Sequence, residues 1–209
     1  MSLLFGIIAL TVGISWYVQD RPQLKEKLLL RPYAVLRKGQ VYRMISHGFI
    51  HADFTHLAFN MFVLWQFGSI IEYQMEQAWS ATPWIEAIHP SFFVLYFGGM
   101  LAAALPSLYK EGNNPHYASL GASGGVSAVM MAYILLFPTH KLLLFFVIPM
   151  PAFVAGILFF AYERYMNRKG GTGIAHDAHL MGAIFGVVYI FLLDDSTMSR
   201  LTQAFMILF

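Results

Sequence analysis

The chain has 209 residues, of which 58% are hydrophobic and only 11% are charged, and its formal net charge is +2. Soluble domains carry about 25% charged residues, so this composition predicts a protein that crosses a lipid bilayer several times. The small net charge argues against a nucleic-acid-binding protein, and a chain without cysteine has no disulfide, no cysteine-bound zinc and no thiol nucleophile.

Six apolar segments follow one another, each close to the length that a helix needs to cross a bilayer. They lie at about residues 3–18, 56–73, 91–109 and 121–137, in a fifth stretch that ends near residue 166, and at 175–193. A long polar and amphipathic segment joins the first two. The first segment has no basic residues before it and no convincing cleavage site after it, so we interpret it as a retained span and not as a signal peptide.

Open strands cannot satisfy their backbone groups in lipid, and six spans leave no residues for a second domain. The sequence therefore predicts an all-α membrane protein without a sheet, in a single domain over residues 1–209. Its six transmembrane helices would form a bundle with a long, partly membrane-embedded first loop. The proline-containing stretch 138–152 predicts an interfacial or re-entrant connection before the fifth span.

Polar residues at the ends of spans are candidates for function, because ionisable side chains inside a bilayer are costly. In the stretch HLAFN, His56 and Asn60 are four residues apart and share one face of a helix. Two hydrogen-bond donors on one face suit the stabilisation of an oxyanion. A polar contact between two helices explains the pair at least equally well.

The stretch GASGG places Ser123 at the start of the fourth span. The first N–H groups of a helix have no acceptor within it, so an oxygen nucleophile there has backbone oxyanion donors beside it. Taken alone, close packing of helices through small residues is the more frequent reason for such a stretch. Ser127, one turn further along, is the rival serine, and we interpret it as a packing residue.

The stretch HDAHLMGAIFG begins the last span. Gly182 and Gly186 form a GxxxG pattern, which is typical of a helix face in close contact with a neighbour. His179 lies three residues before Gly182 and therefore on the same face. A histidine on such a face needs a partner, and Ser123 can be that partner if the fourth and sixth spans are in contact.

Alternate spans enter the membrane from the same side, so His56, Ser123 and His179 are expected at similar depth near one membrane face. This joint placement predicts a Ser–His hydrolase with Ser123 as nucleophile and His179 as general base. The oxyanion donors would be His56, Asn60 and the backbone N–H of Ser123. Asp177 points elsewhere on its helix, because it is two residues from His179, so we expect a dyad without an acidic third member.

Taken in order, these motifs resemble those of the rhomboid intramembrane serine proteases. GASGG resembles the family's GxSG around the nucleophile, AHLMGAIFG its AHxxGxxxG around the base, and HLAFN its HxxxN. His51 matches a histidine that is frequent in the family, and Tyr42-Arg43 stands where the family often has Trp-Arg. The resemblance covers nearly the whole chain.

The resemblance implies a six-helix bundle with a short central fourth helix and a water-filled cavity. It implies a serine endopeptidase that cleaves single-span transmembrane proteins and needs no cofactor and no metal. A substrate helix would enter laterally and unwind locally, and the glycine-rich loop 170–173 is a candidate cap that must move. The expected location is a bacterial inner membrane, with the protein crossing it several times and the site facing the extracytoplasmic side.

The basic residues favour the opposite orientation, because loops rich in lysine and arginine stay in the cytoplasm. The side opposite the proposed site carries only Lys141 and Arg200. All other basic residues lie on the side of the site: Arg21, Lys25, Lys27, Arg31, Arg37, Lys38, Arg43, Lys110, Arg164, Arg168 and Lys169. We nevertheless expect an extracytoplasmic site, because the long first connecting segment is partly embedded in the membrane.

Two other functions stay open. A metal-dependent membrane enzyme or a metal transporter would use the histidines that gather on one side, since imidazole suits zinc, copper or iron. No HExxH motif is present, and no acidic residue within a span completes such a site. A client-binding protein on the same scaffold would need neither Ser123 nor His179 for its function.

Overall fold

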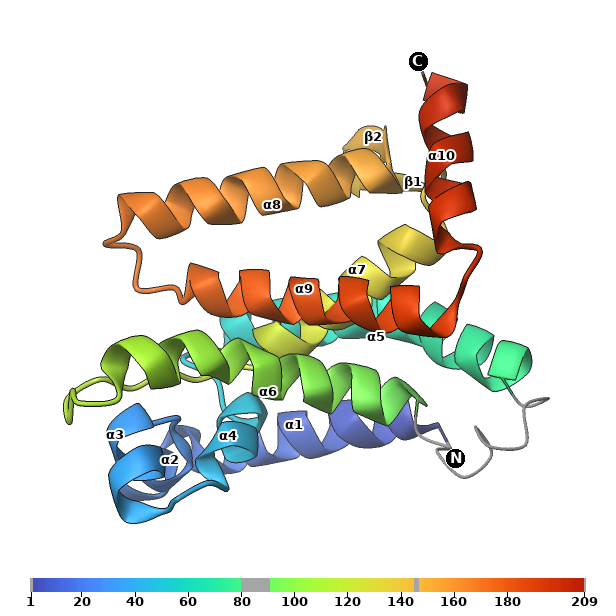
Figure 1. Ribbon diagram of the computed structural model, residues 1–209. Coiled ribbons are helices and arrows are strands. Elements are labelled where there is room, and N and C mark those ends of the chain that lie inside the picture. Colours follow the sequence, from blue (N-terminus) through green and yellow to red (C-terminus); the bar gives the residue numbers. More distant parts are fainter. Residues whose placement is uncertain (1, 80–90, 145–146, 209) are drawn as a thin grey trace.

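The computed structural model describes residues 2–79, 91–144 and 147–208, and these are mostly helical (Figure 1). The predicted loop between the second and third spans therefore lies largely outside the described residues. The elements in the first part of the chain are α1 (Leu3–Gln19), α2 (Pro22–Leu28), α3 (Pro32–Lys38), α4 (Arg43–Ser46), η1 (His47–Phe49), α5 (Phe54–Trp79), α6 (Ser91–Glu111) and α7 (Ser123–Leu136). They are followed by β1 (Lys141–Leu144), β2 (Ile148–Pro151), α8 (Ala152–Lys169), α9 (His176–Leu193) and α10 (Thr197–Leu208).

Three helices in the described part of the chain are long and apolar enough to cross a bilayer: Phe54–Gln77, Phe92–Glu111 and His176–Leu193. The helices Leu3–Gln19 and Ser123–Leu136 are apolar but shorter. The second half of α8 carries several charged residues, which lower its hydropathy. Length and composition alone therefore identify three candidate spans, fewer than the six that the sequence predicts.

Helices of opposite direction alternate around α7, which lies at the centre of the molecule. In Figure 1, α5, α7 and α9 run in one direction, and α1, α6 and α8 run in the other. α7 contacts α5, α6, α8 and α9, and most of its residues are buried. The starts of α5, α7 and α9 consequently lie at the same end of the molecule.

Glycines allow α9 to lie directly against the backbone of α7. A Cβ atom added at Gly182 would be 2.2 Å from the carbonyl oxygen of Gly124, and one added at Gly186 would be 2.3 Å from that of Ala128. Side chains at these positions would overlap the neighbouring backbone. The prediction that the GxxxG pattern marks a closely packed face is confirmed.

The segment between α1 and α5 folds into short helices fastened by one buried arginine. The guanidinium of Arg43 donates to the carbonyl oxygens of Glu26 at 2.9 Å and Leu29 at 2.7 Å, and to Oε1 of Gln40 at 2.6 Å. Five donors in a fixed planar arrangement allow one arginine to satisfy several acceptors. The neighbouring Tyr42 donates through its hydroxyl to the carbonyl of the same segment, at Lys27.

The prediction that the chain has no sheet is wrong for the stretch before α8. β1 pairs with β2 in an antiparallel hairpin, with Lys141 opposite Pro151 and Leu144 opposite Ile148. A two-stranded hairpin has a free edge on both strands, so it tolerates proline, which has no N–H to donate. The helical bundle is unaffected, because the hairpin only connects α7 to α8.

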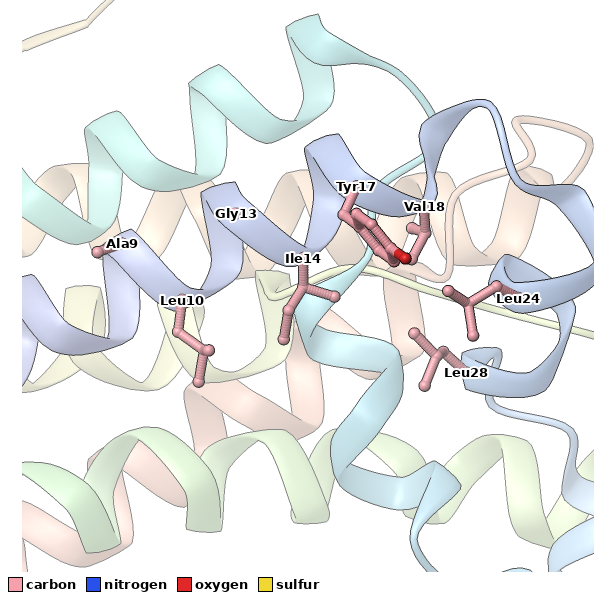
Figure 2. A pocket seen from close by; sticks show the side chains of 8 residues that line it. All are labelled: Ala9, Leu10, Gly13, Ile14, Tyr17, Val18, Leu24 and Leu28. Atoms are coloured by element: carbon pink, nitrogen blue, oxygen red, sulfur yellow. The ribbon is translucent and has the colours of Figure 1, made fainter.

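An apolar groove of about 410 Å³ lies between α1 and α2 (Figure 2). Its lining residues are Ala9, Leu10, Gly13, Ile14, Tyr17, Val18, Leu24 and Leu28. None of these is a predicted site residue, and the lining offers almost no polar surface. The groove therefore plays no part in the chemistry described below.

Candidate active site

Ser123 and His179 are in direct contact although they are far apart in the sequence. Ser123 is the first residue of α7, and His179 lies in the first turn of α9. Nε2 of His179 is 2.8 Å from Oγ of Ser123. The contact depends on the close approach of α9 to α7 at Gly182, which brings the starts of both helices together. A hydroxyl within hydrogen-bond distance of an imidazole is the arrangement that activates a serine nucleophile.

Glu163 of α8 lies beside this pair, and sequence reasoning missed it. Its Oε1 is 3.1 Å from Nδ1 of His179, and its Oε2 is 2.6 Å from Nδ1 of His176. Glu163 and His176 are both buried. The sequence predicts no acidic partner for His179, and the structure differs because the partner comes from another helix. Asp177 lies elsewhere, in an ion pair with Lys110 at 2.7 Å.

The same cluster has the composition of a metal site. One ligand atom from each of Glu163, His176 and His179 lies within 4.8 Å of the others. Two imidazoles and a carboxylate are a donor set that zinc accepts. The argument that no acidic residue accompanies the histidines is therefore wrong. In the structure, however, the Nδ1 atoms of both histidines are already within hydrogen-bond distance of the carboxylate.

His56 and Asn60 lie in the first two turns of α5. The backbone N–H of His56 donates to Oδ1 of Asp53 at 2.8 Å, as in a helix N-cap. A Cβ atom added at Gly121 would be 2.9 Å from Cε1 of His56, so this ring borders the loop that leads to Ser123. Asn60 is buried, and its amide donates to the carbonyl of His56 at 2.9 Å. This bond leaves one N–H of that amide for another acceptor.

His51 connects the loop before α5 to the residue that precedes the nucleophile. The N–H of Ala122 donates to Nε2 of His51 at 3.4 Å. Nδ1 of His51 therefore carries the proton and donates to Oγ of Ser15 at 2.9 Å, and that hydroxyl donates to the carbonyl of Phe49. Burial of the ring lowers the pKa of His51 to about 3, so the ring is neutral at physiological pH.

The remaining predicted residues have clear places. Ser127 is buried one turn further along α7, whereas the hydroxyl that His179 contacts is that of Ser123. The backbone of the glycine-rich loop has positive φ angles at Gly170, Gly171 and Gly173, a conformation that glycine adopts without a steric cost. The loop is joined to the buried cluster through Thr172, whose Oγ1 is 2.9 Å from Nε2 of His176.

A family model described as the Rhomboid domain matches residues 38–195. RHOMBOID-like protein 12, mitochondrial, of Arabidopsis thaliana is 30% identical over 195 residues, which cover 90% of this chain and 57% of that protein. Rhomboid protein 1, mitochondrial, of Saccharomyces cerevisiae is 32% identical over 171 residues, which cover 77% and 45%. Presenilin-associated rhomboid-like protein, mitochondrial, of Homo sapiens is 32% identical over 150 residues, which cover 70% and 36%.

The names of these relatives bear on location. All three are mitochondrial proteins, and the chain spans about half of their length or less. The predicted location in a bacterial inner membrane, with an extracytoplasmic site, is therefore wrong. It rested on the motifs of the family, and these do not distinguish one membrane from another. The family model covers most of the chain and the relatives agree with it, so the chain belongs to the rhomboid family.

Proposed function

We propose that this protein is an intramembrane serine endopeptidase with Ser123 as nucleophile and His179 as general base. Rhomboid proteins are typically intramembrane serine proteases, and membership of the family supports this activity. The observation that carries the assignment of residues is the 2.8 Å contact between Oγ of Ser123 and Nε2 of His179. Catalysis by a serine requires a base that takes its proton as it attacks, and His179 is in position to do so.

In the proposed reaction, Oγ of Ser123 bonds to the carbonyl carbon of the scissile peptide while its proton passes to Nε2 of His179. The carbonyl oxygen becomes an oxyanion, which accepts hydrogen bonds from the Ser123 N–H, His56 and the free N–H of Asn60. His179 then returns the proton to the leaving nitrogen as the C–N bond breaks. Water, activated by His179 in the same way, hydrolyses the acyl-enzyme and restores the serine.

We further propose that α1, α5, α6, α7, α8 and α9 form a six-span bundle in a single domain over residues 1–209. α7 has 14 residues and is therefore about 21 Å long, which is less than the roughly 30 Å hydrocarbon core of a bilayer. Ser123, at the start of a short central helix, would lie below the membrane surface. Such a site suits single-span transmembrane substrates, whose helices must unwind locally to expose a carbonyl.

The names of the relatives support a mitochondrial membrane as the location of this protein. A tagged chain expressed in a eukaryotic cell should then sediment with mitochondria and resist extraction by carbonate. Recovery in the plasma-membrane fraction would contradict this location without bearing on the proposed chemistry.

The proposed activity is tested with purified protein in detergent and a model single-span substrate. The wild type should cleave the substrate, and Ser123→Ala and His179→Ala should abolish cleavage. Ser127→Ala is the matched control, because it removes a buried hydroxyl one turn away in the same helix, and it should keep activity. A fluorophosphonate probe should label Ser123. Cleavage that survives both Ser123→Ala and His179→Ala, or labelling of Ser127, would overturn the assignment.

A further inference from the structure

A continuous set of hydrogen bonds leads from the glycine-rich loop to Glu163. The N–H of Ile174 donates to Oγ1 of Thr172 at 3.3 Å. The Thr172 hydroxyl is 2.9 Å from Nε2 of His176 and can donate its own proton to it. In the tautomer of His176 in which Nε2 accepts this proton, Nδ1 carries the ring proton and donates to Oε2 of Glu163 at 2.6 Å.

The directions on the other side of Glu163 follow from the chemistry of the nucleophile. A serine that is to lose its proton must donate to Nε2 of His179, which is 2.8 Å away. The proton of the neutral ring is then on Nδ1, which donates to Oε1 of Glu163 at 3.1 Å. With both rings donating through Nδ1, both oxygens of Glu163 act as acceptors, as those of an ionised carboxylate do.

We propose that Glu163 is a positioning residue for His179 and completes a Ser–His–Glu arrangement. This inference rests on the proposed function. A carboxylate at Nδ1 fixes the tautomer in which Nε2 is free to accept the serine proton. It also favours the transition state, because its buried negative charge has no cationic partner in the cluster until His179 becomes an imidazolium. An interaction that is stronger in the transition state than in the ground state raises kcat.

His176 supports this role by holding the second carboxylate oxygen. His176 and Glu163 are both buried, and their 2.6 Å contact restricts rotation of the carboxylate about its last bond. Glu163 lies on the buried face of α8 together with Ala152 and Gly156, two small residues that allow α8 to pack closely. The carboxylate is therefore fixed by its own helix and by a residue of α9.

A metal ion is the competing use of this cluster. A metal bound through the Nδ1 atoms of His176 and His179 would have to displace the protons that both rings donate to Glu163. It would also remove the tautomer constraint, since a metal-bound imidazole keeps its remaining proton on Nε2, where the serine proton must go. The two uses of the cluster therefore predict different effects of a chelator. A chelator should leave the activity unchanged if the cluster is hydrogen-bonded, and should abolish it if the cluster holds a required metal ion.

The test is Glu163→Gln in the purified enzyme, with Asp177→Asn as the matched control. The control removes a carboxylate two residues before His179 in the first turn of α9, where the side chain forms an ion pair with Lys110. Glu163→Gln should lower kcat by about 10²–10⁴ with little change in KM, as expected when the tautomer of the base is no longer fixed. Labelling of Ser123 by a fluorophosphonate should slow in parallel, and Asp177→Asn should stay close to wild type.

The pH dependence separates positioning from a merely structural role. Without the carboxylate the imidazolium is less stable, so the acidic limb of the kcat/KM profile should move to lower pH in Glu163→Gln. Glu163→Asp keeps the negative charge, and it should recover part of kcat and the wild-type acidic limb. Thermal unfolding shows which variants fold. If Glu163→Gln does not fold, the kcat and the pH profile of Glu163→Asp test the proposal instead.

Four results would overturn the proposal. The first is a glutamine variant with the kcat and pH profile of the wild type. The second is an aspartate variant that is folded but no better than the glutamine variant. The third is loss of wild-type activity in EDTA with recovery on adding Zn²⁺, which would assign the cluster to a metal. The fourth is a wild type that neither cleaves nor reacts at Ser123, which refutes the proposed function itself and is recognised before any variant of Glu163 is made.

Discussion

The imidazole of His51 accepts a hydrogen bond from the backbone N–H of Ala122 at 3.4 Å, and so ties the loop before α5 to the residue next to the nucleophile. A second bond, from the N–H of Gly121 to the carbonyl of His47 at 2.9 Å, fixes the same loop one residue earlier. The first bond requires a neutral ring, because a protonated imidazole has no lone pair to accept with. The position of Ser123 therefore depends on the charge of a histidine that is not part of the proposed chemistry.

We expect the protein to lose stability in acid because of this ring. Burial lowers the pKa of folded His51 to about 3, whereas an unfolded histidine has a pKa of about 6.5. The stabilisation is complete above pH 6.5 and is lost as the pH falls from there toward 3, because the unfolded chain then binds a proton that the folded chain does not. One such proton costs about 1.4 kcal/mol per pH unit.

Thermal unfolding in detergent at a series of pH values checks this expectation. His51→Gln is the informative variant, since its amide can accept from the Ala122 N–H and donate to Ser15 without titrating. Between pH 6.5 and 4 its Tm should fall less steeply than that of the wild type. Buried His47, whose pKa burial lowers to about 4, contributes equally in both proteins and cancels in the comparison. Equal slopes of Tm against pH in the two proteins would show that folded His51 binds its proton in the same pH range as an unfolded histidine.

A methyl group at Gly182 should separate the two proposed catalytic residues. In Gly182→Ala the new Cβ would meet the carbonyl oxygen of Gly124 at 2.2 Å, which forces α9 away from α7. Overpacking of this kind costs about 1–3 kcal/mol of stability. Because His179 lies one turn from Gly182, the shift would also lengthen its contact with Ser123, so we expect cleavage to fall by more than tenfold.

Gly13→Ala is the control for this substitution. Gly13 lies within α1, and a Cβ atom added there has no neighbour within 4 Å. Alanine is the better helix former by about 1 kcal/mol, so this variant should be as stable as the wild type or slightly more so. A Gly182→Ala protein with normal Tm and normal cleavage would mean that α7 and α9 are further apart than described.

Local patterns predicted the parts of the site that lie near one another in the sequence. The i, i+4 spacing of His56 and Asn60 and the i, i+3 spacing of His179 and Gly182 follow from helix geometry alone, and the contact of Ser123 with His179 required only that two neighbouring helices meet at their starts. The sequence did not predict the hairpin before α8, because prolines in a short stretch favour an irregular connection. Proline is tolerated in a strand with a free edge, and only the structure shows that both strands have one.

Glu163 could not be found in this way, because its partners are on another helix. In the sequence it stands in AYERYMNRK, the polar end of a helix, where an acidic residue is usually solvated. A signal is nevertheless present. Glu163 is seven residues after Gly156 and eleven after Ala152, so it continues a face of small residues. An acidic side chain on a face of that kind is buried and needs a partner, although only the structure identifies which one.

Loss of the Arg43 side chain should destabilise the segment between α1 and α5. Arg43→Ala removes the buried guanidinium that donates to the carbonyl oxygens of Glu26 and Leu29, and a hydrogen bond from a charged group contributes about 1.5–3 kcal/mol. Arg37→Ala is the control, because its guanidinium lies at the surface and contacts the side chain of Asn113. We expect a lower Tm for the first variant and a change of less than about 1 kcal/mol for the second; equal Tm values would contradict the role of Arg43.

The remaining prediction concerns the oxyanion donors. Asn60 uses one N–H of its amide on the carbonyl of His56, which holds the side chain in place and leaves the second N–H for the substrate. Removing a single oxyanion donor lowers kcat by about 10²–10³. Asn60→Ala should therefore show a loss of this size in the cleavage of a model substrate, with KM changed by less than about threefold, because the lost bond forms mainly in the transition state. Asn60→Asp keeps the size of the side chain, but an ionised carboxylate has no proton to donate and repels the oxyanion, and a protonated one has a single O–H in place of two N–H groups. This variant should therefore be at least as impaired as the alanine variant. If the aspartate variant instead keeps most of its activity while the alanine variant does not, Asn60 supports the start of α5 through packing, and the oxyanion depends on His56 and the backbone of Ser123.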